Sequence, residues 1–222
     1  MDKYKHRYVT RKEEQKNNMS VSVILAHPRK GSFNHAIAAT CVKVLEGNGH
    51  MVNFHDLYAE GFESVLPFDE FDRDIALPSE IEAHCEEISA AKGIVIVHPN
   101  WWGQPPAILK GWIDRVIRPG VAYEFVQGDK GEGVPRGLLN ADSAIVFNTS
   151  NTNAERERTV FGDPLELIWK NCIFDLCGVR EFFRTTFSII VTSTDKERRL
   201  WLTEVAEIIG ERYPKKSHNQ AF

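Results

Sequence analysis

The chain has 222 residues, of which 42% are hydrophobic and 26% are charged, and its formal net charge is −4 at pH 7. This length fits one large domain, and the apolar fraction excludes a chain that is disordered throughout. A small negative charge does not provide the basic face of a nucleic-acid-binding protein. No long uncharged apolar segment predicts a membrane span, and the charged N-terminus lacks the apolar core of a secretory signal.

The N-terminal residues differ from the rest of the chain. Residues 1–19 are mostly charged or polar and show no helical or strand period, so we expect a mobile extension. Met19 is an alternative start of translation. Residues 20–222 are predicted to form a single domain.

Cysteines and histidines, the residue types that most often bind metals, are scattered along the chain. The cysteines are Cys41, Cys85, Cys172 and Cys177. They lack zinc-site spacing and are expected to be buried thiols of a cytoplasmic protein. The eight histidines form no convincing ligand set, and we expect His50, His55 and His84 to be solvated. No metal site is predicted.

Five apolar runs are predicted to be strands. Residues 20–26, SVSVILA, are nearly continuous and rich in branched side chains, which is typical of a strand covered on both faces. The other predicted strands are residues 51–56, 93–98, 143–148 and 184–191.

Amphipathic segments between these runs are predicted to be helices. Residues 33–47 place apolar side chains on one face and end at Gly47 and Gly49. That face consists of Ile37, Ala38, Cys41, Val44 and Leu45. The helix after Pro105 is expected to bury Ile108, Leu109, Trp112, Ile113 and Val116, with Lys110 and Asp114 paired on its exposed side.

Three further helices are predicted. Residues 79–91 form a weaker helix, and residues 119–140 are expected to be irregular. Asp163 is expected to cap a helix with Pro164 in its first turn and Glu166 three residues beyond the cap. Residues 195–213 form the last helix. Its apolar positions are Leu200, Val205, Ile208 and Ile209.

Strands that alternate with helices predict an α/β fold, in which helices cover both faces of a five-stranded parallel sheet. We expect a three-layer sandwich with strand order 2-1-3-4-5. In such a sheet, ligands bind outside the carboxyl ends of the strands, where the strand order reverses. The loops after strands one, three and four therefore form the candidate site.

The first loop, residues 27–34 (HPRKGSFN), joins a strand to a helix N-terminus. Free N–H groups and the helix dipole favour an anion there, and Arg29 or Lys30 adds positive charge. The alternative is that Ser32 merely caps the helix. The loop lacks GxGxxG and the P-loop lysine motif, which disfavours a Rossmann NAD pocket.

The second loop, residues 99–104 (PNWWGQ), follows the strand predicted over residues 93–98. Trp101 and Trp102 would place an aromatic edge beside a flat heterocycle, which backbone N–H and C=O groups would orient. The alternative is that one or both tryptophans belong to the core.

The third loop, residues 148–153 (NTSNTN), is either a simple turn or a group of donors that stabilises negative charge on a reduced ring. The three loops would bind a phosphate, a flat ring and the polar edge of that ring, a combination that favours a flavin pocket.

These residues resemble the flavodoxin-like NAD(P)H:quinone oxidoreductases, the family that contains DT-diaphorase. The strongest motif consists of Pro105 and residues 107–112 (AILKGW), followed by residues 114–116 (DRV). The segments Ser32-Phe33-Asn34 and Ala122-Tyr123 also match, and the resemblance covers about residues 20–192.

The resemblance implies a bound flavin, with FAD favoured over FMN, and two-electron hydride transfer from NAD(P)H to an acceptor such as a quinone. It also implies a homodimer with two sites at its interface. Phosphate-binding residues would be His27, Ser32, Phe33 and Asn34. Pro99, Asn100, Trp101, Trp102 and Gly103 would line the isoalloxazine, and Asn148, Thr149, Ser150 and Asn151 its N1/O2 edge. Tyr123, Phe125 and Phe161 would belong to the substrate pocket.

The chain departs from the family pattern after the fourth strand. Glu155 and Phe161 stand where DT-diaphorase has a Tyr and a His that move charge and protons, and Ser150 and Asn151 stand in place of glycines. That proton relay therefore does not carry over, which leaves Tyr123 and Glu155 as the catalytic candidates. Some bacterial relatives are ancillary proteins of potassium-efflux systems, so the alternative function is a regulatory flavoprotein that binds a transporter or another partner. An electron-transfer flavodoxin would typically be more acidic than this chain.

Overall fold

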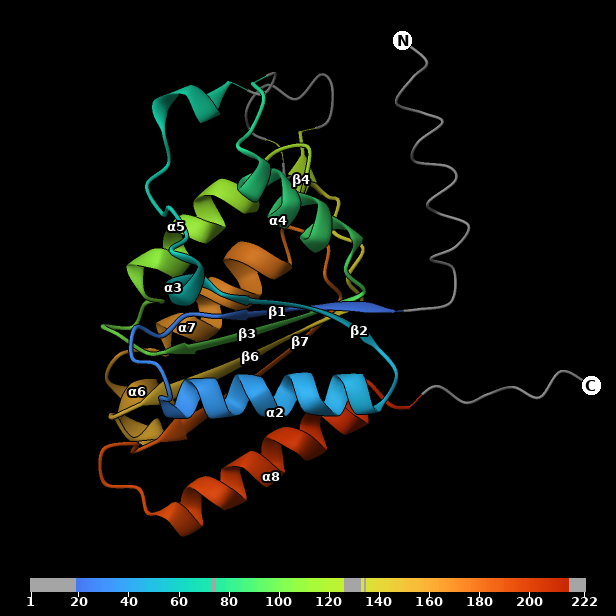
Figure 1. Cartoon of the computed structure of the whole chain (residues 1–222). Coiled ribbons are helices and arrows are strands. Elements are labelled where there is room, and N and C mark those ends of the chain that lie inside the picture. The colour runs from blue at the N-terminus through green and yellow to red at the C-terminus, as the bar shows by residue number, and fades with distance from the viewer. Residues whose placement is uncertain (1–18, 73–74, 126–132, 134, 216–222) are drawn as a thin grey trace, which may run out of the picture.

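The computed structural model describes residues 19–72, 75–125, 133 and 135–215. Five parallel strands form the central sheet, in the order β2-β1-β3-β6-β7, which confirms the predicted order (Figure 1). The strands are β1 (Ser20–Leu25), β2 (Met51–Asp56), β3 (Gly93–Pro99), β6 (Ser143–Ser150) and β7 (Glu181–Ser188). The predicted extension, residues 1–19, lies outside the described residues except for Met19.

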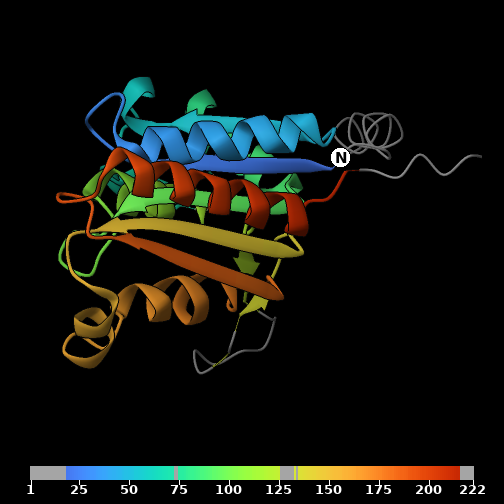
Figure 2. The same cartoon turned by 90° about the horizontal axis from the view of Figure 1, so that it is seen from below.

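Helices cover both faces of the sheet, as Figure 2 shows from below. They are α2 (Phe33–Gly47), α3 (Leu57–Glu60), η1 (Phe68–Phe71), α4 (Ser79–Ala90), α5 (Ala107–Val116), α6 (Ala154–Thr159), α7 (Pro164–Leu167), the π-helical η2 (Ile168–Phe174) and α8 (Asp195–Arg212). A two-stranded ribbon, β4 (Tyr123–Glu124) with β5 (Arg136–Gly137), lies within the segment expected to be irregular.

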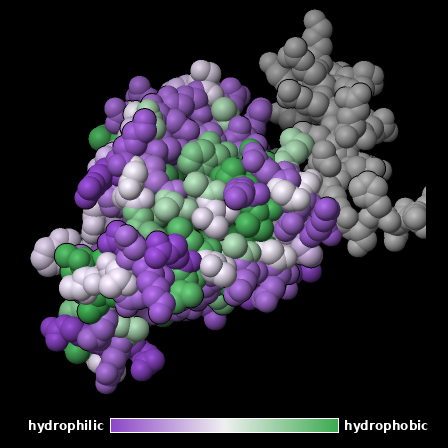
Figure 3. Space-filling model, turned by 60° about the horizontal axis from the view of Figure 1, so that its bottom comes forward, coloured by the Kyte–Doolittle hydropathy of each residue, from purple (hydrophilic) through white to green (hydrophobic). Residues whose placement is uncertain are grey.

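Side-chain alternation along the strands divides the core into two layers. Val95 and Val97 pack on the α2 and α8 side, whereas Ile94 and Ile96 pack on the α4, α5 and η2 side. In Figure 3, which views the α2 and α8 side, apolar side chains gather in the middle of the face among hydrophilic ones. Within the described residues, no helix is both long and apolar enough to cross a membrane.

The helix predicted to begin at Asp163 forms differently from expectation. Asp163 has φ +48° and makes no side-chain capping bond, because its carboxylate pairs with Arg184 of β7 instead. The helical turn α6, which precedes it, was not predicted. The last strand also begins at Glu181, three residues earlier than expected. Ile108, expected to be buried, is only half-buried, and the apolar Leu200 of the last helix is exposed.

Some polar residues lie in places that the sequence did not predict. His50 and His84 are buried and His55 is half-buried, so the expectation that they are solvated was wrong. Cys172 is exposed, whereas the other three cysteines are buried as expected.

His55 and His84 come together beside Glu60, with potential ligand atoms within 4.8 Å of one another. Trp112 Nε1 donates to His84 Nδ1 at 3.2 Å, so a neutral His84 carries its proton on Nε2. A metal ion on Nε2 would require the proton to move to Nδ1, where it would oppose the Trp112 N–H.

Candidate active site

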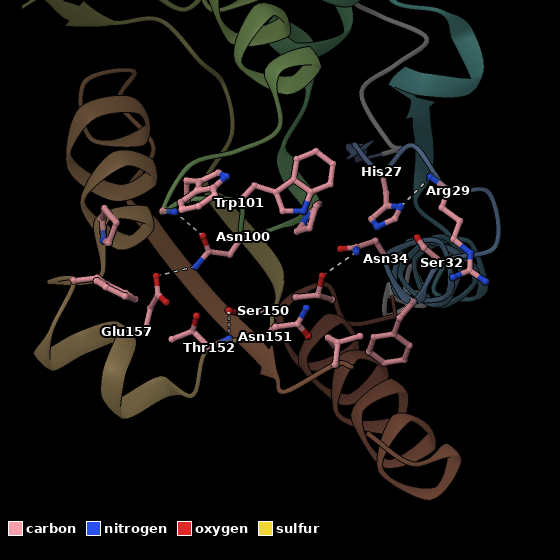
Figure 4. Close-up of a pocket in the computed structure, with 18 of the residues that line it drawn as sticks. His27, Arg29, Ser32, Asn34, Asn100, Trp101, Ser150, Asn151, Thr152 and Glu157 are labelled. Atoms are coloured by element: carbon pink, nitrogen blue, oxygen red, sulfur yellow. Dashed lines mark hydrogen bonds between the residues drawn. The ribbon is translucent and has the colours of Figure 1, made fainter. Parts of the chain in front are cut away.

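A cavity of about 780 Å³ opens at the carboxyl ends of β1, β3 and β6 (Figure 4). All three predicted loops contribute to its lining, together with α6, the start of α7 and the start of α8. This position follows from topology, because the strand order reverses between β1 and β3.

The first loop joins β1 to the N-terminus of α2. Ser32 occupies the capping position but makes no capping bond, so the simple capping interpretation was wrong; its Oγ lies 2.9 Å from His35 Nδ1. The first N–H groups of this 15-residue helix therefore remain available to an anion at the cavity. Burial lowers the pKa of His27, whose Nδ1 accepts from the Arg29 N–H at 3.1 Å. The neutral ring thus carries its proton on Nε2.

Asn34 provides a test of whether the cavity fits a polar ligand. Its side chain is buried and Nδ2 donates to Thr149 Oγ1 at 2.9 Å, which joins the first and third loops. Its Oδ1 has no hydrogen-bond partner among the described residues. An unsatisfied buried carbonyl beside a cavity is costly unless a ligand donates to it. The site therefore fits a group that carries hydroxyl or N–H donors.

The second loop, residues 99–104, is a tight turn, which we call the aromatic loop. Trp101 and Gln104 exchange backbone hydrogen bonds of 3.1 and 3.0 Å, and both residues between them have positive φ. Trp102, at +58°, is unusual there because its Cβ is strained in this region. The exposed fractions of Trp101 and Trp102 are 40% and 99%, so the interpretation as core tryptophans was wrong.

The aromatic loop is braced from α6 and α7. Asn100 Oδ1 accepts from the Gly103 N–H at 3.0 Å, and Asn100 Nδ2 donates to Glu157 Oε1 at 2.8 Å. Figure 4 shows Asn100 between the loop and Glu157. A Cβ on Gly103 would lie 2.6 Å from Pro164 Cγ, so only glycine permits this close approach.

The third loop is held in place by its own polar groups. Ser150 Oγ accepts from the Thr152 N–H at 3.0 Å, and Asn151 Oδ1 accepts from the Val191 N–H at 2.9 Å. Asn148 does not line the cavity. Strand alternation turns it to the η2 side, where its amide is bonded to His98 and Arg184.

Comparison with known proteins places the chain in a family. A sequence profile described as flavodoxin-like fold matches residues 19–201. The chain is 32% identical to an uncharacterized NAD(P)H oxidoreductase of Haemophilus influenzae, covering 85% of this chain and 93% of the relative.

Two solved structures are also similar. Smu.1420 from Streptococcus mutans UA159 has 32% identity and a TM-score of 0.72, with 87% of this chain and 100% of that chain covered. The NAD(P)H:quinone oxidoreductase from Methanothermobacter marburgensis has 25% identity and a TM-score of 0.74, with 91% and 100% covered. This chain belongs to the flavodoxin-like NAD(P)H:quinone oxidoreductase family. It is therefore an oxidoreductase.

In this member of the family, most of the residues predicted for the site come together around the cavity. They are His27, Ser32, Phe33, Asn34, Pro99, Asn100, Trp101, Trp102, Gly103, Thr149, Ser150, Asn151 and Phe161. Tyr123, Phe125 and Glu155 are not among the lining residues. Both aromatics lie in or next to β4, which Figure 1 shows away from the carboxyl ends of the sheet.

Sequence reasoning missed several lining residues of this oxidoreductase. They are Thr152, Glu157, Pro164, Ile190 and Arg198. Glu157 lies in a run of charged residues, where nothing marks one carboxylate as buried. Arg198 comes from α8, which follows the last strand rather than one of the three site loops.

Proposed function

We propose that this chain is a flavin-dependent NAD(P)H oxidoreductase that transfers a hydride to a quinone or a similar small acceptor in a two-electron, ping-pong reaction. The observation that carries the proposal is the cavity, which combines a helix N-terminus, an aromatic loop and a polar loop. Its volume of about 780 Å³ lies within the range of cofactor sites, about 300–1,000 Å³. A bound flavin would supply the ring that accepts and passes on the hydride.

The chain's own residues have distinct binding roles in this proposal. The α2 N-terminus and Ser32 would bind phosphate, and the aromatic loop would lie against the ring. Thr149, Ser150 and Asn151 would face its polar edge and stabilise negative charge there. Trp102, which is fully exposed, would stand at the rim where the nicotinamide and the acceptor enter.

FAD is our first choice of cofactor and FMN is the alternative. The lining continues past Phe33 to Ile190 and Arg198. The Arg198 guanidinium lies 5.9 Å from the centre of the Phe33 ring, close to the α2 N-terminus. The positive charge of Arg198 favours FAD over FMN, because FAD has a second phosphate that needs its own partner.

We also propose a homodimer. Tyr123 and Phe125 do not line the cavity of their own chain, so the substrate-pocket role that the family resemblance implies for them would require the cavity of a second copy. The names of the reported relatives give no support to the alternative of a transporter subunit. The cytoplasmic location stays a prediction.

The test begins with the absorbance spectrum of the purified protein and mass identification of any released cofactor. We expect a yellow protein, or a colourless one that binds added FAD. Stopped-flow mixing with NADPH or NADH should then bleach the flavin, and 1,4-benzoquinone should restore its colour. Protein that stays colourless with FAD and FMN, or bound flavin that neither nucleotide bleaches, would contradict the proposal. Sedimentation that shows only monomer at micromolar concentration would contradict the dimer.

A further inference from the structure

A row of buried polar side chains lies beneath the aromatic loop. On β3 and β6, the face toward α5 and η2 carries apolar residues and then His98 and Asn148 respectively. These two residues are register partners and both are fully buried. Arg184 continues the row on β7, where its side chain is 8% exposed. None of the three lines the cavity.

The hydrogen bonds of His98 fix its protonation. Trp169 Nε1 and Asn148 Nδ2 both lie 2.9 Å from His98 Nε2, and each can only donate there. His98 is therefore neutral, with its proton on Nδ1, which lies 2.8 Å from the Pro99 carbonyl oxygen. Pro99 is the first residue of the aromatic loop, so this imidazole connects the buried row to the loop.

Arg184 extends the row to the cavity wall. Its Nη1 donates to Asn148 Oδ1 at 3.1 Å, and its Nε donates to Glu166 Oε2 at 2.9 Å. Its Nη2 donates to Asp163, the residue before Pro164. Because Pro164 packs on Gly103, the chain of contacts that leaves the aromatic loop at Pro99 returns to it at Gly103.

We propose that Arg184 and His98 are positioning residues, which hold the aromatic loop against the cavity wall without touching the ligand. The loop needs such support because the positive φ of Trp102 is unfavourable unless its surroundings impose it. The inference rests on the proposed function only for the identity of the ligand.

The protonation of His98 should determine whether the row supports the aromatic loop. Burial lowers the pKa of His98 to about 4, against the opposing effect of its hydrogen bond to the Pro99 carbonyl, and the positive charge of Arg184 lowers this pKa further. The charged groups at the row are Arg184 from β7, with Asp163 and Glu166 bound to it from the start of α7. A proton on Nε2 would oppose two donors, so the support of the loop should fail as the pH falls toward 4.

The test compares Arg184→Gln with Arg212→Gln. Glutamine can still donate to Asn148 but carries no charge. Arg212 is the control, because it is an arginine that pairs with Glu181, the first residue of β7, at 3.6 Å and makes no contact with His98 or Asn148 in the hydrogen bonds of the row. Two readouts need no flavin: the titration of His98 followed by NMR, and hydrogen exchange of the amides of the aromatic loop. The third readout is the Kd for FAD, from quenching of flavin fluorescence.

In Arg184→Gln we expect His98 to titrate at a higher pH, the loop amides to exchange faster, and the Kd for FAD to rise about tenfold. Arg212→Gln should match the wild type in all three. Equal His98 titration and equal loop exchange in Arg184→Gln and the wild type would overturn the inference.

Two more variants separate positioning from loss of folding. Arg184→Lys keeps the charge but not the planar fork, so His98 should still titrate at low pH while the loop amides exchange faster than in the wild type. His98→Phe removes the titrating group. The FAD affinity of this variant should therefore not decrease as the pH falls toward 4, whereas the affinity of the wild type should. An unchanged pH profile in His98→Phe would also overturn the inference. Wild-type protein that binds no flavin would refute the proposed function, while the two flavin-free readouts would still decide the role of the row.

Discussion

Asn100 Nδ2 donates a hydrogen bond to Glu157 Oε1 at 2.8 Å, across 57 positions of sequence. The same amide accepts from the Gly103 N–H, so one side chain joins the aromatic loop to α6. Both residues line the cavity, and Glu157 is only 7% exposed. The shape of the aromatic loop therefore depends on a carboxylate from a different segment.

Removing this carboxylate should loosen the aromatic loop. Glu157→Ala leaves the half-buried Asn100 amide without its acceptor, which costs about 1 kcal/mol, the lower end of the range for a buried donor. We expect the Kd for FAD to rise severalfold, measured by fluorescence titration. Glu155→Ala is the control, because Glu155 is exposed and outside the cavity lining. Equal FAD affinity in the two variants would show that the bond to Asn100 does not matter for binding.

The unsatisfied carbonyl of Asn34 predicts that a substitution affects the melting temperature differently without and with FAD. Asn34→Leu removes an oxygen that, under the proposed function, would accept a hydrogen bond from the flavin. We expect the melting temperature without flavin to change little, because the lost bond to Thr149 is offset by the removal of a buried orphan acceptor. The rise in melting temperature on adding FAD should shrink strongly. An undiminished rise would mean that Asn34 does not contact the ligand.

Trp101 should matter more for flavin retention than an equally exposed aromatic elsewhere. Trp201 is a poor control, because its ring lies 5.8 Å from that of Phe33, which lines the cavity. Phe54 of β2 is 43% exposed, close to the 40% of Trp101, and lies outside the lining. Trp101→Ala should release flavin on dialysis and Phe54→Ala should retain it. Equal retention would place the ring elsewhere.

The family motif on α5 contains a buried ion pair. Arg115 donates to Glu70 through Nε at 3.1 Å and Nη2 at 2.5 Å, and the two side chains are 3% and 4% exposed. Arg115→Met should lower the free energy of unfolding by about 3 kcal/mol, because it leaves a buried carboxylate short of its main partner.

The control for Arg115 is Lys110→Met, which breaks an exposed pair with Asp114 on the same helix. That change should cost less than about 1 kcal/mol. Urea denaturation measures both variants. Similar losses of unfolding free energy in the two variants would show that burial does not determine how much the Arg115–Glu70 pair contributes to stability.

Stability should fall on the acid side of neutrality. Burial, followed by the nearby His55, lowers the pKa of His84 from its usual 6.5 to about 4. The unfolded chain therefore binds a proton at His84 below pH 6.5 that the folded chain refuses until about pH 4, and stability is lost between these values. Urea denaturation at pH 7 and pH 5 should show a smaller difference for His84→Gln than for the wild type. An equal difference would assign the acid sensitivity to other groups.

Much of the fold followed from the sequence. The strands and main helices were predictable because branched apolar runs and helical spacing act over short distances, as in residues 20–26 and 33–47. Errors arose where a local signal had a distant competitor. Asp163 has the composition of a helix cap, but Arg184, 21 positions away, takes its carboxylate.

The site divides in the same way. The sequence by itself determined that three loops lie at one edge, because the carboxyl ends of parallel strands share an edge and a crevice opens where the strand order reverses. Only the tertiary structure decided which side chains face the cavity. Strand alternation turned Asn148 toward His98 and away from the lining, and packing of α6 buried Glu157 among exposed charged neighbours. The physical reason is that periodicity reports the environment of an element's faces, whereas a hydrogen-bond partner is chosen by contacts between residues far apart in the chain.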